Sequence, residues 1–442
     1  MKRETTIEND KTTASDGSGQ SQSHSELTEP MLPTSTEKTA WRSIYIAGLC
    51  SFIQATQFAI FFASMWPYIL TLDPHVKQSS FGIVVALYSF SQCICSPVFG
   101  YWSNKIGQVR FPLIIGFIIM AFGNLTYLSL QFWSDNHLYV MMGARLVAGA
   151  GTGNMGLLRA YASTASTSKD RSRAIACVSG GIAIGSMVGP GLQLLFAPLG
   201  THGITIFGLT INIYTSPALF CLLLNALGLL IVNFAFEEKY IIKSDKTVEV
   251  GKEEGEKQGT NTKLSKLANP DVIALLLCVF TRFSQIFLNT TTESIGSAYT
   301  MMMFSFEKEE AVTVNAGIHT VSGSIAAAMY ICFIFTGTYF IGFVLVFGVS
   351  FSFMNITVTT LYSKIVGPRP QGTYQGVYQM AGSFGRLIAP LLMSSTYTMF
   401  GPTVPWQILI VTMIIIIAAW LVLRERMVPF EKHVAKRVEP VQ

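Results

Sequence analysis

The chain contains 442 residues with a mass of 48.4 kDa; half of them are hydrophobic and only 12% are charged, against about 25% in ordinary soluble domains. This composition excludes a soluble globular protein, because apolar runs of about 20 residues, long enough to cross a bilayer, recur between Trp41 and Leu423. The net charge of +5 would ordinarily suggest an acidic partner, but the charges fall almost wholly in predicted tails and loops, where they indicate topology. We expect an all-α polytopic membrane protein, surrounded by membrane lipid, with no nucleic-acid partner.

The predicted elements form two bundles joined by a linker. Residues 1–42 are rich in Ser, Thr, Glu, Lys and Gln, which predicts a disordered cytosolic tail. Six spans then form an N-terminal six-helix bundle over residues 43–236, at 43–70, 81–100, 111–131, 138–160, 174–197 and 212–236. Residues 237–270 are polar and lysine-rich, as expected of a cytosolic linker. Five spans form an incomplete C-terminal bundle over 271–423, at 271–303, 311–335, 339–361, 373–399 and 405–423, and residues 424–442 form a cytosolic tail.

Basic residues set the orientation of these roughly 11 spans. With the N-terminus in the cytosol, 24 of the 30 Lys and Arg residues fall on the cytosolic side, which is the asymmetry that the positive-inside rule describes. Only Lys77 and Lys308 fall on the opposite side. The other four lie inside predicted spans: Arg145, Arg159, Arg282 and Arg386.

The two bundles resemble each other, as expected of a transporter built from repeated halves. Residues of the fourth and fifth spans recur about 200 positions later, Asn154 and Tyr161 as Asn355 and Tyr362, and Gly185 and Pro190 as Gly385 and Pro390. The second half is shorter by about 28 residues between its start and these positions. Either one helix is missing from this form of the protein, or part of the segment is re-entrant.

Nothing in the sequence indicates catalysis. The seven cysteines show neither a CxxC pair nor a Cys/His ligand spacing, so neither a disulfide framework nor a metal site is expected. A nucleotide-binding loop is also absent from the sequence. We therefore predict that the protein is not an enzyme and uses no cofactor, so that transport would be passive or driven by an ion or proton gradient.

The loop between the second and third spans carries a motif. It reads GYWSNKIGQVR, with Gly100, Asn104, Lys105 and Gly107 at its key positions. This resembles the GxxxDRxGRR loop signature of the major facilitator superfamily, in which a tight glycine turn carries polar and cationic groups that latch neighbouring helices. Asn104 replaces the acid of the signature. A charge–charge contact at this position is therefore not expected, but a hydrogen-bonded contact is still compatible with the sequence. The alternative is an ordinary basic turn.

Two further helix motifs resemble the same superfamily. The fourth span reads RLVAGAGTGNMGLLRAY, with small residues that let helices approach closely. The fifth span reads GGIAIGSMVGPG, where Gly185, Gly189 and Pro190 form a candidate hinge because proline removes a backbone donor and glycine permits bending. Pro390 is the matching proline of the second half. Together these resemblances imply the major facilitator fold of two helical bundles.

Longer stretches are similar to lysosomal members of the superfamily, including SPVFGYWSNK, GNMGLLRAY and TLYSKIVGPRPQG. The departure from that pattern is the absent helix, in the place of a ninth. The resemblance implies a multi-pass protein of the lysosomal or endosomal membrane that carries chloride. The tail segment EPML, Glu29 to Leu32, resembles a degenerate dileucine signal for sorting adaptors.

Charged residues inside the spans are the candidate ion pathway, because such residues are costly in lipid and usually face a watery interior. Four arginines and one acid, Glu293, give a positive interior that favours an anion. Arg386 is the first candidate for anion contact. Arg145 is the second, although it could instead bond helix carbonyls, and Glu293 could bind a proton, gate, or form a salt bridge. We interpret Arg159 as snorkelling to the cytosolic surface, and leave Arg282 outside the candidate site.

The leading hypothesis is an endolysosomal transport protein that moves a small anion, chloride in the first place, between its two bundles. One alternative is a proton-coupled carrier of a larger organic or inorganic anion, for which Glu293 would be essential. Another is a membrane scaffold that keeps the fold without transporting.

Overall fold

The computed structural model describes residues 38–61, 64–76, 78–133, 135–200, 203–206, 208–241, 270–304, 348–401 and 403–428. Most of both predicted tails, most of the linker and the span predicted at 311–335 lie outside these residues.

The N-terminal half consists of α1 (Trp41–Ala59), α2 (Met65–Leu72), α3 (Gln78–Ile106), α4 (Arg110–Leu128), α5 (His137–Thr152), α6 (Met155–Thr164), α7 (Arg171–Leu194) and α8 (Ser216–Leu230). Two predicted spans are each divided in two. The first is α1 followed by α2, and the fourth breaks between α5 and α6 at Gly153, whose amide bonds the carbonyl three residues earlier. A hairpin that we did not predict, β1 (Ile204–Ile206) with antiparallel β2 (Leu209–Ile211), precedes α8.

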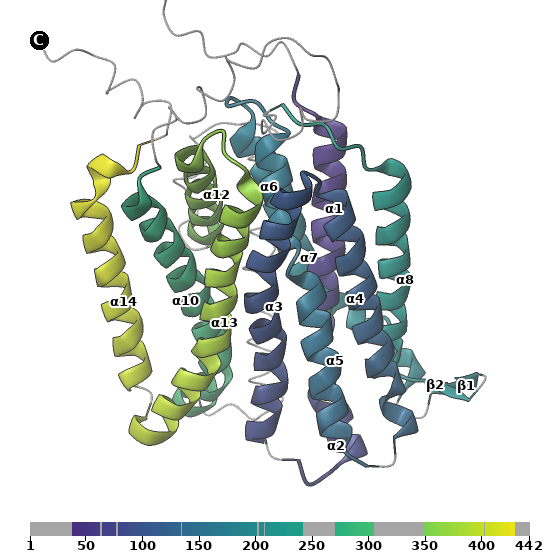
Figure 1. Cartoon of the computed structure of the whole chain (residues 1–442). Helices are drawn as coiled ribbons and strands as arrows, with labels where there is room; N and C mark the ends of the chain where they lie inside the picture. The colour runs from purple at the N-terminus through teal and green to yellow at the C-terminus, as the bar shows by residue number, and fades with distance from the viewer. Residues whose placement is uncertain are drawn as a thin grey trace, which may run out of the picture. The chain divides into compact units, whose positions relative to one another are not determined.

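The C-terminal half is described as α10 (Val272–Phe304), α12 (Gly348–Val366), α13 (Gln371–Phe400) and α14 (Thr403–Val422). Short helical turns complete the chain: η1 (Ser129–Phe132), η2 (Ala197–Leu199), η3 (Ile231–Ala235) and η6 (Arg424–Arg426). Helix α13 lies between α10 and α3, so it joins the two halves (Figure 1).

Within the described residues, five helices are long and apolar enough to cross a membrane by length and composition: Gly82–Ile106, Arg110–Phe132, Ser216–Ala235, Val272–Thr291 and Thr403–Val422. The total of about 11 spans therefore stays a prediction. Helix α14 shows the lipid-facing extreme, since only Pro405, Leu409 and Ile416 on it are buried.

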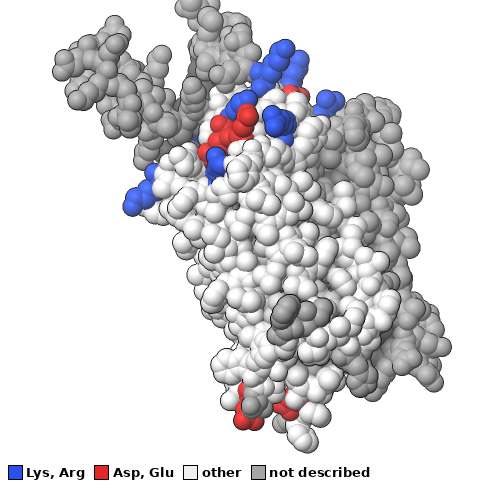
Figure 2. All heavy atoms as spheres, turned by 90° about the vertical axis from the view of Figure 1, so that its right-hand side faces the viewer, with Lys and Arg blue, Asp and Glu red and all other residues white. Residues whose placement is uncertain are grey.

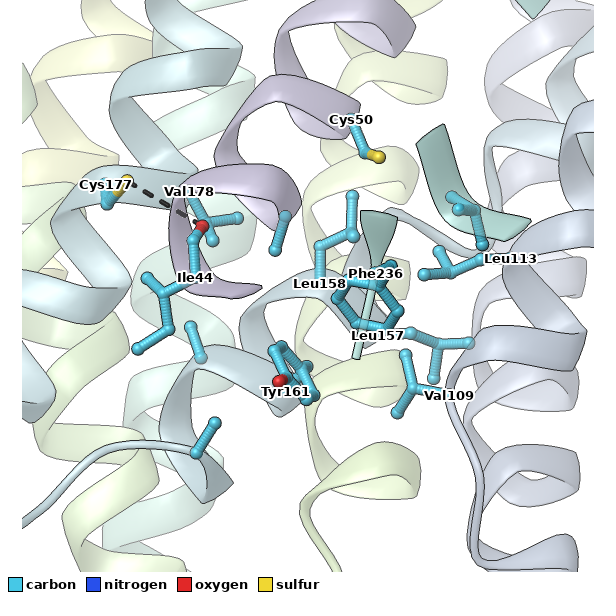
Figure 3. Close-up of a cluster of buried hydrophobic side chains, with 14 of the residues drawn as sticks. Ile44, Cys50, Val109, Leu113, Leu157, Leu158, Tyr161, Cys177, Val178 and Phe236 are labelled. Carbon is cyan, nitrogen blue, oxygen red and sulfur yellow. Dashed lines mark hydrogen bonds between the residues drawn. The ribbon is translucent and has the colours of Figure 1, made fainter. Parts of the chain in front are cut away.

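The N-terminal half has two apolar cores. The first joins α1, α4, α6 and α7 through Ile44, Leu113, Leu158 and Val178 (Figure 3). The second lies around Met65, Tyr68, Val84, Met141 and Cys221, toward the opposite ends of these helices. Together they fix the helices that carry the candidate site.

Charge divides the two ends of the helices. On the face in Figure 2, Lys and Arg gather at one end together with some acidic residues, and acidic residues alone are coloured at the other end. Lys105 in the last turn of α3 and Arg110 at the start of α4 belong to the first, which we call the basic end.

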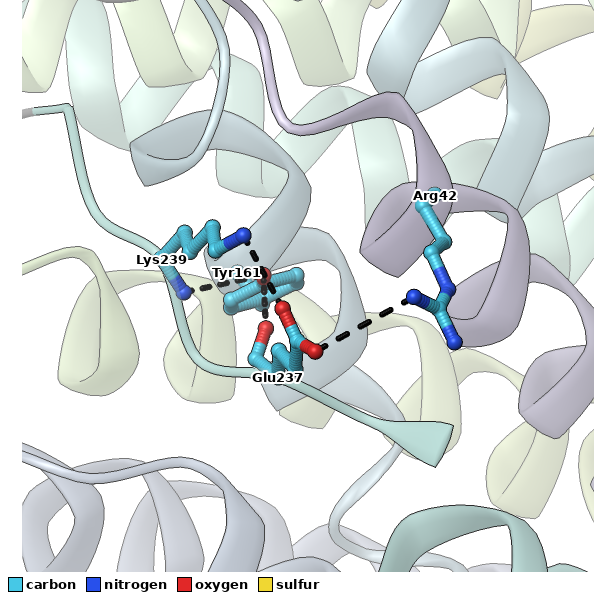
Figure 4. Close-up of polar contacts among 4 residues, drawn as sticks. All are labelled: Arg42, Tyr161, Glu237 and Lys239. Carbon is cyan, nitrogen blue, oxygen red and sulfur yellow. Dashed lines mark hydrogen bonds and ion pairs between the residues drawn. The ribbon is translucent and has the colours of Figure 1, made fainter. Parts of the chain in front are cut away.

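At the basic end, the segment after α8 ties several helices together. The Glu237 carboxylate pairs with Lys239 at 2.9 Å and Arg42 at 4.0 Å, and the Tyr161 hydroxyl donates to the Glu237 carbonyl at 3.0 Å (Figure 4). The Glu238 carboxylate accepts hydrogen bonds from the Val109 and Arg110 amides. An acid at that position satisfies free amides and the dipole at the start of α4.

Candidate functional site

The two halves meet along a polar seam between α3 and α13. On α3 the facing residues recur every four positions, as Gln92, Ser96, Gly100 and Asn104. Residues four positions apart lie on the same face of a helix, because four positions make about one turn. The partners on α13 are Gly372, Gly376 and Ser383. We call this contact the α3–α13 seam.

Glycine brings the two backbones of the seam together. A Cβ added at Gly100 would lie 2.4 Å from the Gly372 carbonyl oxygen, and one added at Gly376 would lie 2.6 Å from the Ser96 carbonyl oxygen. Real Cβ atoms do not approach backbone oxygens so closely, and therefore the seam needs glycine at both positions.

Asn104 forms the hydrogen-bonded contact that the loop motif left open. Its side-chain amide donates to the Thr373 hydroxyl at 2.7 Å and its oxygen accepts from the Gly372 amide at 3.0 Å. Lys105 beside it is exposed, and Gly107 turns the chain into α4 with a φ of 70°, a conformation that glycine adopts without strain. A role of these residues in gating stays a prediction.

Arg145 lies deep in the N-terminal half and is only 3% exposed. Its guanidinium carbon is 4.7 Å from the centre of the Tyr88 ring and 5.1 Å from that of Phe61. The predicted alternative, bonding to helix carbonyls, finds no support among the described residues, and the buried Nε has no hydrogen-bond acceptor there. A positive charge thus rests on aromatic faces.

Arg386 is half-buried on α13, with its guanidinium carbon 4.8 Å from the centre of the Phe58 ring. Phe58 and Tyr88 lie 4.9 Å apart between their ring centres. The two candidate arginines therefore stand at the ends of one row, Arg386, Phe58, Tyr88 and Arg145, that crosses between the halves. We call it the arginine–aromatic row.

Two corrections concern the other arginines. The prediction that Arg159 snorkels is wrong: it is 1% exposed and donates to the Gln379 side-chain oxygen of α13 at 2.6 Å. Arg282, which we left outside the site, is 5% exposed and donates to Asn355 at 2.8 Å and Gln285 at 3.1 Å. Polar residues at every fourth position of α13 were the signal for this interface, at Gln371, Gln375, Gln379 and Ser383.

The remaining predicted residues have different positions. Glu293 belongs to α10 and Pro190 to α7, but their side chains lie outside the described part of the structure. Helix α7 continues through Gly185, Gly189 and Pro190, and α13 continues through Pro390. The glycines pack within the halves, since a Cβ at Gly185 would lie 2.5 Å from the Phe52 carbonyl oxygen of α1.

The described side chains include no group of three or more His, Cys, Asp or Glu residues that could hold a metal ion. The described cysteines are free thiols, and Cys332 lies outside that part of the chain. Arginine, amide and aromatic groups are therefore the chemistry that this interface offers.

A comparison with protein-family models identifies the family that has this architecture. The sequence matches the model of the Major Facilitator Superfamily over residues 47–390. The chain belongs to the Major Facilitator Superfamily. As a member, it is a multi-pass membrane transporter and not an enzyme.

Relatives and solved structures of the Major Facilitator Superfamily agree. The chain is 26% identical over 477 positions to the Xenopus laevis protein named Major facilitator superfamily domain-containing protein 8, covering 89% of this chain and 93% of that one. The fold is similar to that of the human organic anion transporter MFSD10, with a TM-score of 0.61 and 16% identity over 86% of this chain and 99% of the other. The Escherichia coli fucose:proton symporter gives 0.62, with 12% identity over 87% and 99%. These likenesses at low identity speak to the fold.

Proposed function

We propose that this transporter moves a small anion, chloride in the first place, across the lysosomal or endosomal membrane along the interface between its two halves. The observation that carries the proposal is Arg145, a buried guanidinium whose Nε has no acceptor among the described residues. Arg145 stands at one end of the arginine–aromatic row, and Arg386 places a second positive charge at the other end.

The energetics favour an anionic ligand. A desolvated charge costs several kcal/mol unless it is paired, while a cation on an aromatic face recovers about 2 kcal/mol. Guanidinium groups keep their charge and offer donors in a fixed geometry. An anion beside Arg145 would supply the missing compensation, and the neutral Phe58–Tyr88 pair lies between Arg145 and Arg386.

Chloride and the endolysosomal membrane come from the resemblance to lysosomal superfamily members, not from the geometry. The orientation with a cytosolic N-terminus is proposed from the positions of Lys and Arg. Sorting adaptors that bind the Glu29–Leu32 segment, and lipid around the exposed apolar helices, complete the proposed partners.

The test is patch-clamp recording on enlarged endolysosomes that contain the full chain. Chloride is replaced by gluconate, and Arg386→Ala and Arg145→Gln are compared with wild type at equal membrane insertion. Losing a charge-assisted contact of about 1.5–3 kcal/mol weakens anion binding by about tenfold or more, so we expect the chloride current to fall by that order. Arg424→Ala, which removes an exposed arginine after α14, is the matched control. An undiminished current in both test variants would contradict the proposal.

The proton-coupled alternative has its own arm. The proton-coupled carrier replaces chloride transport as the hypothesis under three conditions. Chloride carries no current, the flux of a larger anion depends on pH, and Glu293→Gln abolishes that flux. Correctly inserted protein with no flux of either kind would leave the scaffold role.

A further inference from the structure

Two other arginines, one from each half, converge on Tyr378 of α13. Arg282 of α10 places its guanidinium carbon 5.5 Å from the centre of the Tyr378 ring. Arg159 of α6 bonds Gln379, the next residue along α13. The Tyr378 hydroxyl accepts a hydrogen bond from Thr359 at 3.1 Å. These positive charges therefore occupy one region of the interface.

The hydrogen-bond acceptors described for Arg282 are neutral. It donates to the amide oxygens of Asn355 and Gln285. Amide oxygens satisfy donors without cancelling charge. The Arg282 Nε is buried and has no acceptor among the described residues.

Gln375 adds an unmatched polar group. It is fully buried one turn before Gln379, on the α13 face that meets α6, where its backbone carbonyl faces Gly156. Neither atom of its side-chain amide has a hydrogen-bond partner among the described residues. A buried amide without partners costs about 1–3 kcal/mol, which a ligand that accepts from its nitrogen would partly recover.

We propose that Arg159, Arg282 and the Gln375–Gln379 amides form a second binding site for a small inorganic anion of the size and charge of chloride, separate from the arginine–aromatic row. The site rests on the proposed function and extends it, because it gives the permeating anion two stations.

The spacing of the stations suits passage. Gln379 and Arg386 are seven residues apart on α13, or about 10 Å at the rise of an α-helix. Ser383 lies between them and donates to the Gln92 side chain of α3 at 2.8 Å. Anions at sites this close repel each other, and repulsion between adjacent sites lets a bound ion leave. The Gln92–Ser383 contact then separates the two stations in the conformation described.

Counting anions by linkage tests the second site. A ligand that binds only the folded state stabilises it in proportion to the logarithm of its concentration, once for each site. The full chain in detergent is unfolded by heat across a series of chloride concentrations, with gluconate holding the ionic strength constant. We expect the slope of Tm against the logarithm of chloride concentration to fall to about half in Arg282→Gln, to about half in Arg145→Gln, and to about zero in the double variant.

The slope distinguishes a ligand site from a structural role. If Arg282 only braces the C-terminal half, Arg282→Gln will lower Tm at every chloride concentration and leave the slope of wild type, which overturns the second site. Arg282→Lys keeps the charge and should retain more of the slope than Arg282→Gln. Arg424→Ala should match wild type.

Failure of the second site can be told from failure of the proposed function. A slope abolished by Arg145→Gln alone and unaffected by Arg282→Gln removes the second site and leaves the first. A wild-type Tm that does not respond to chloride overturns both.

Discussion

Two close helix contacts in this protein use glycine alike but differ in what accompanies it. Within the N-terminal half, Gly181, Gly185 and Gly189 of α7 lie against the α1 backbone, and the described side-chain hydrogen bond across them is the weak one from the Cys177 thiol to the Ile44 carbonyl at 3.9 Å (Figure 3). Between the halves, the α3–α13 seam also relies on glycine, but it adds the side-chain bonds of Asn104 and Gln92.

The difference indicates which contact can open. Backbones packed against backbones, with apolar side chains around them, lose dispersion contacts on separation and gain nothing from water. Side-chain hydrogen bonds exchange with water at a net cost of only about 1 kcal/mol each. We therefore expect the α1–α7 contact to persist through transport and the α3–α13 seam to part.

The largest expected effect breaks the permanent contact. In Gly185→Val, the new side chain meets the Phe52 carbonyl oxygen, which a Cβ would approach to 2.5 Å, and neither backbone can move. Overpacking typically costs about 1–3 kcal/mol and often more. We expect loss of the monodisperse peak in size-exclusion chromatography. Gly82→Val, at a position with nothing within 4 Å of a Cβ, is the control, and a normal peak with unchanged Tm for Gly185→Val would show that the contact is not rigid.

The next effect falls on the separable seam. Gly100→Val should fold, because the halves can move apart, but it should hold the basic end open. The assay places a cysteine at buried Gln375 and measures its reaction with a membrane-impermeant maleimide. We expect Gln375→Cys to react about tenfold faster when Gly100→Val is present than when Gly100 is kept, because destabilising the closed state by about 1.4 kcal/mol raises the open population about tenfold. Gly143→Val, where a Cβ meets nothing within 4 Å, should not change the rate. Equal labelling in all three proteins would mean that the seam tolerates the side chain.

A smaller change removes only hydrogen bonds. Asn104→Ala loses the bonds to Thr373 and Gly372, and a net loss of about 1 kcal/mol raises the open population by about fivefold. The same maleimide assay reads it. Thr373→Val removes the other side of the same hydrogen bond. If the two side chains act together, the variant with both substitutions should react with the maleimide about as fast as Asn104→Ala alone. Additive effects would assign Asn104 a different role.

The smallest expected effect lies at the basic end, outside the α1–α7 contact and the α3–α13 seam. The hydrogen bond from Lys239, with the charges of Lys239 and Arg42, lowers the pKa of the exposed Glu237 carboxyl. Because the pKa is lowered on folding, the pair contributes stability above the ordinary glutamate pKa of about 4.3 and loses it as pH falls through the lowered value. The Tm difference between wild type and Glu237→Gln should be small at pH 7 and shrink as the pH falls through the lowered pKa. A difference that does not shrink would point to packing instead of charge.

The sequence predicted the architecture better than the contacts. Apolar runs, the Lys and Arg asymmetry and three motifs pointed to the superfamily, because helix length and loop charge are local properties. Arg159 was misread because its position near a helix end suggested snorkelling, while its actual partner, Gln379, lies 220 residues away. Periodicity tells which face of a helix is polar, as on α13, but it does not tell which helix covers that face. The division of the first span into α1 and α2 likewise left no turn signal in the sequence.

One contact carries a consequence for the origin of the interface. The hydroxyls of Ser163 and Ser363 lie 2.5 Å apart, and they follow the matching residues Tyr161 and Tyr362 by two positions and by one. A contact between matching segments of the two repeats is the intramolecular form of an isologous contact, the kind made across the two-fold axis of a homodimer. In an ancestor with two identical copies, every substitution in this segment would have changed both sides at once. Fusion into one chain freed each side to vary alone, and it is this freedom that allows an arginine such as Arg282 to exist in one half without a twin in the other.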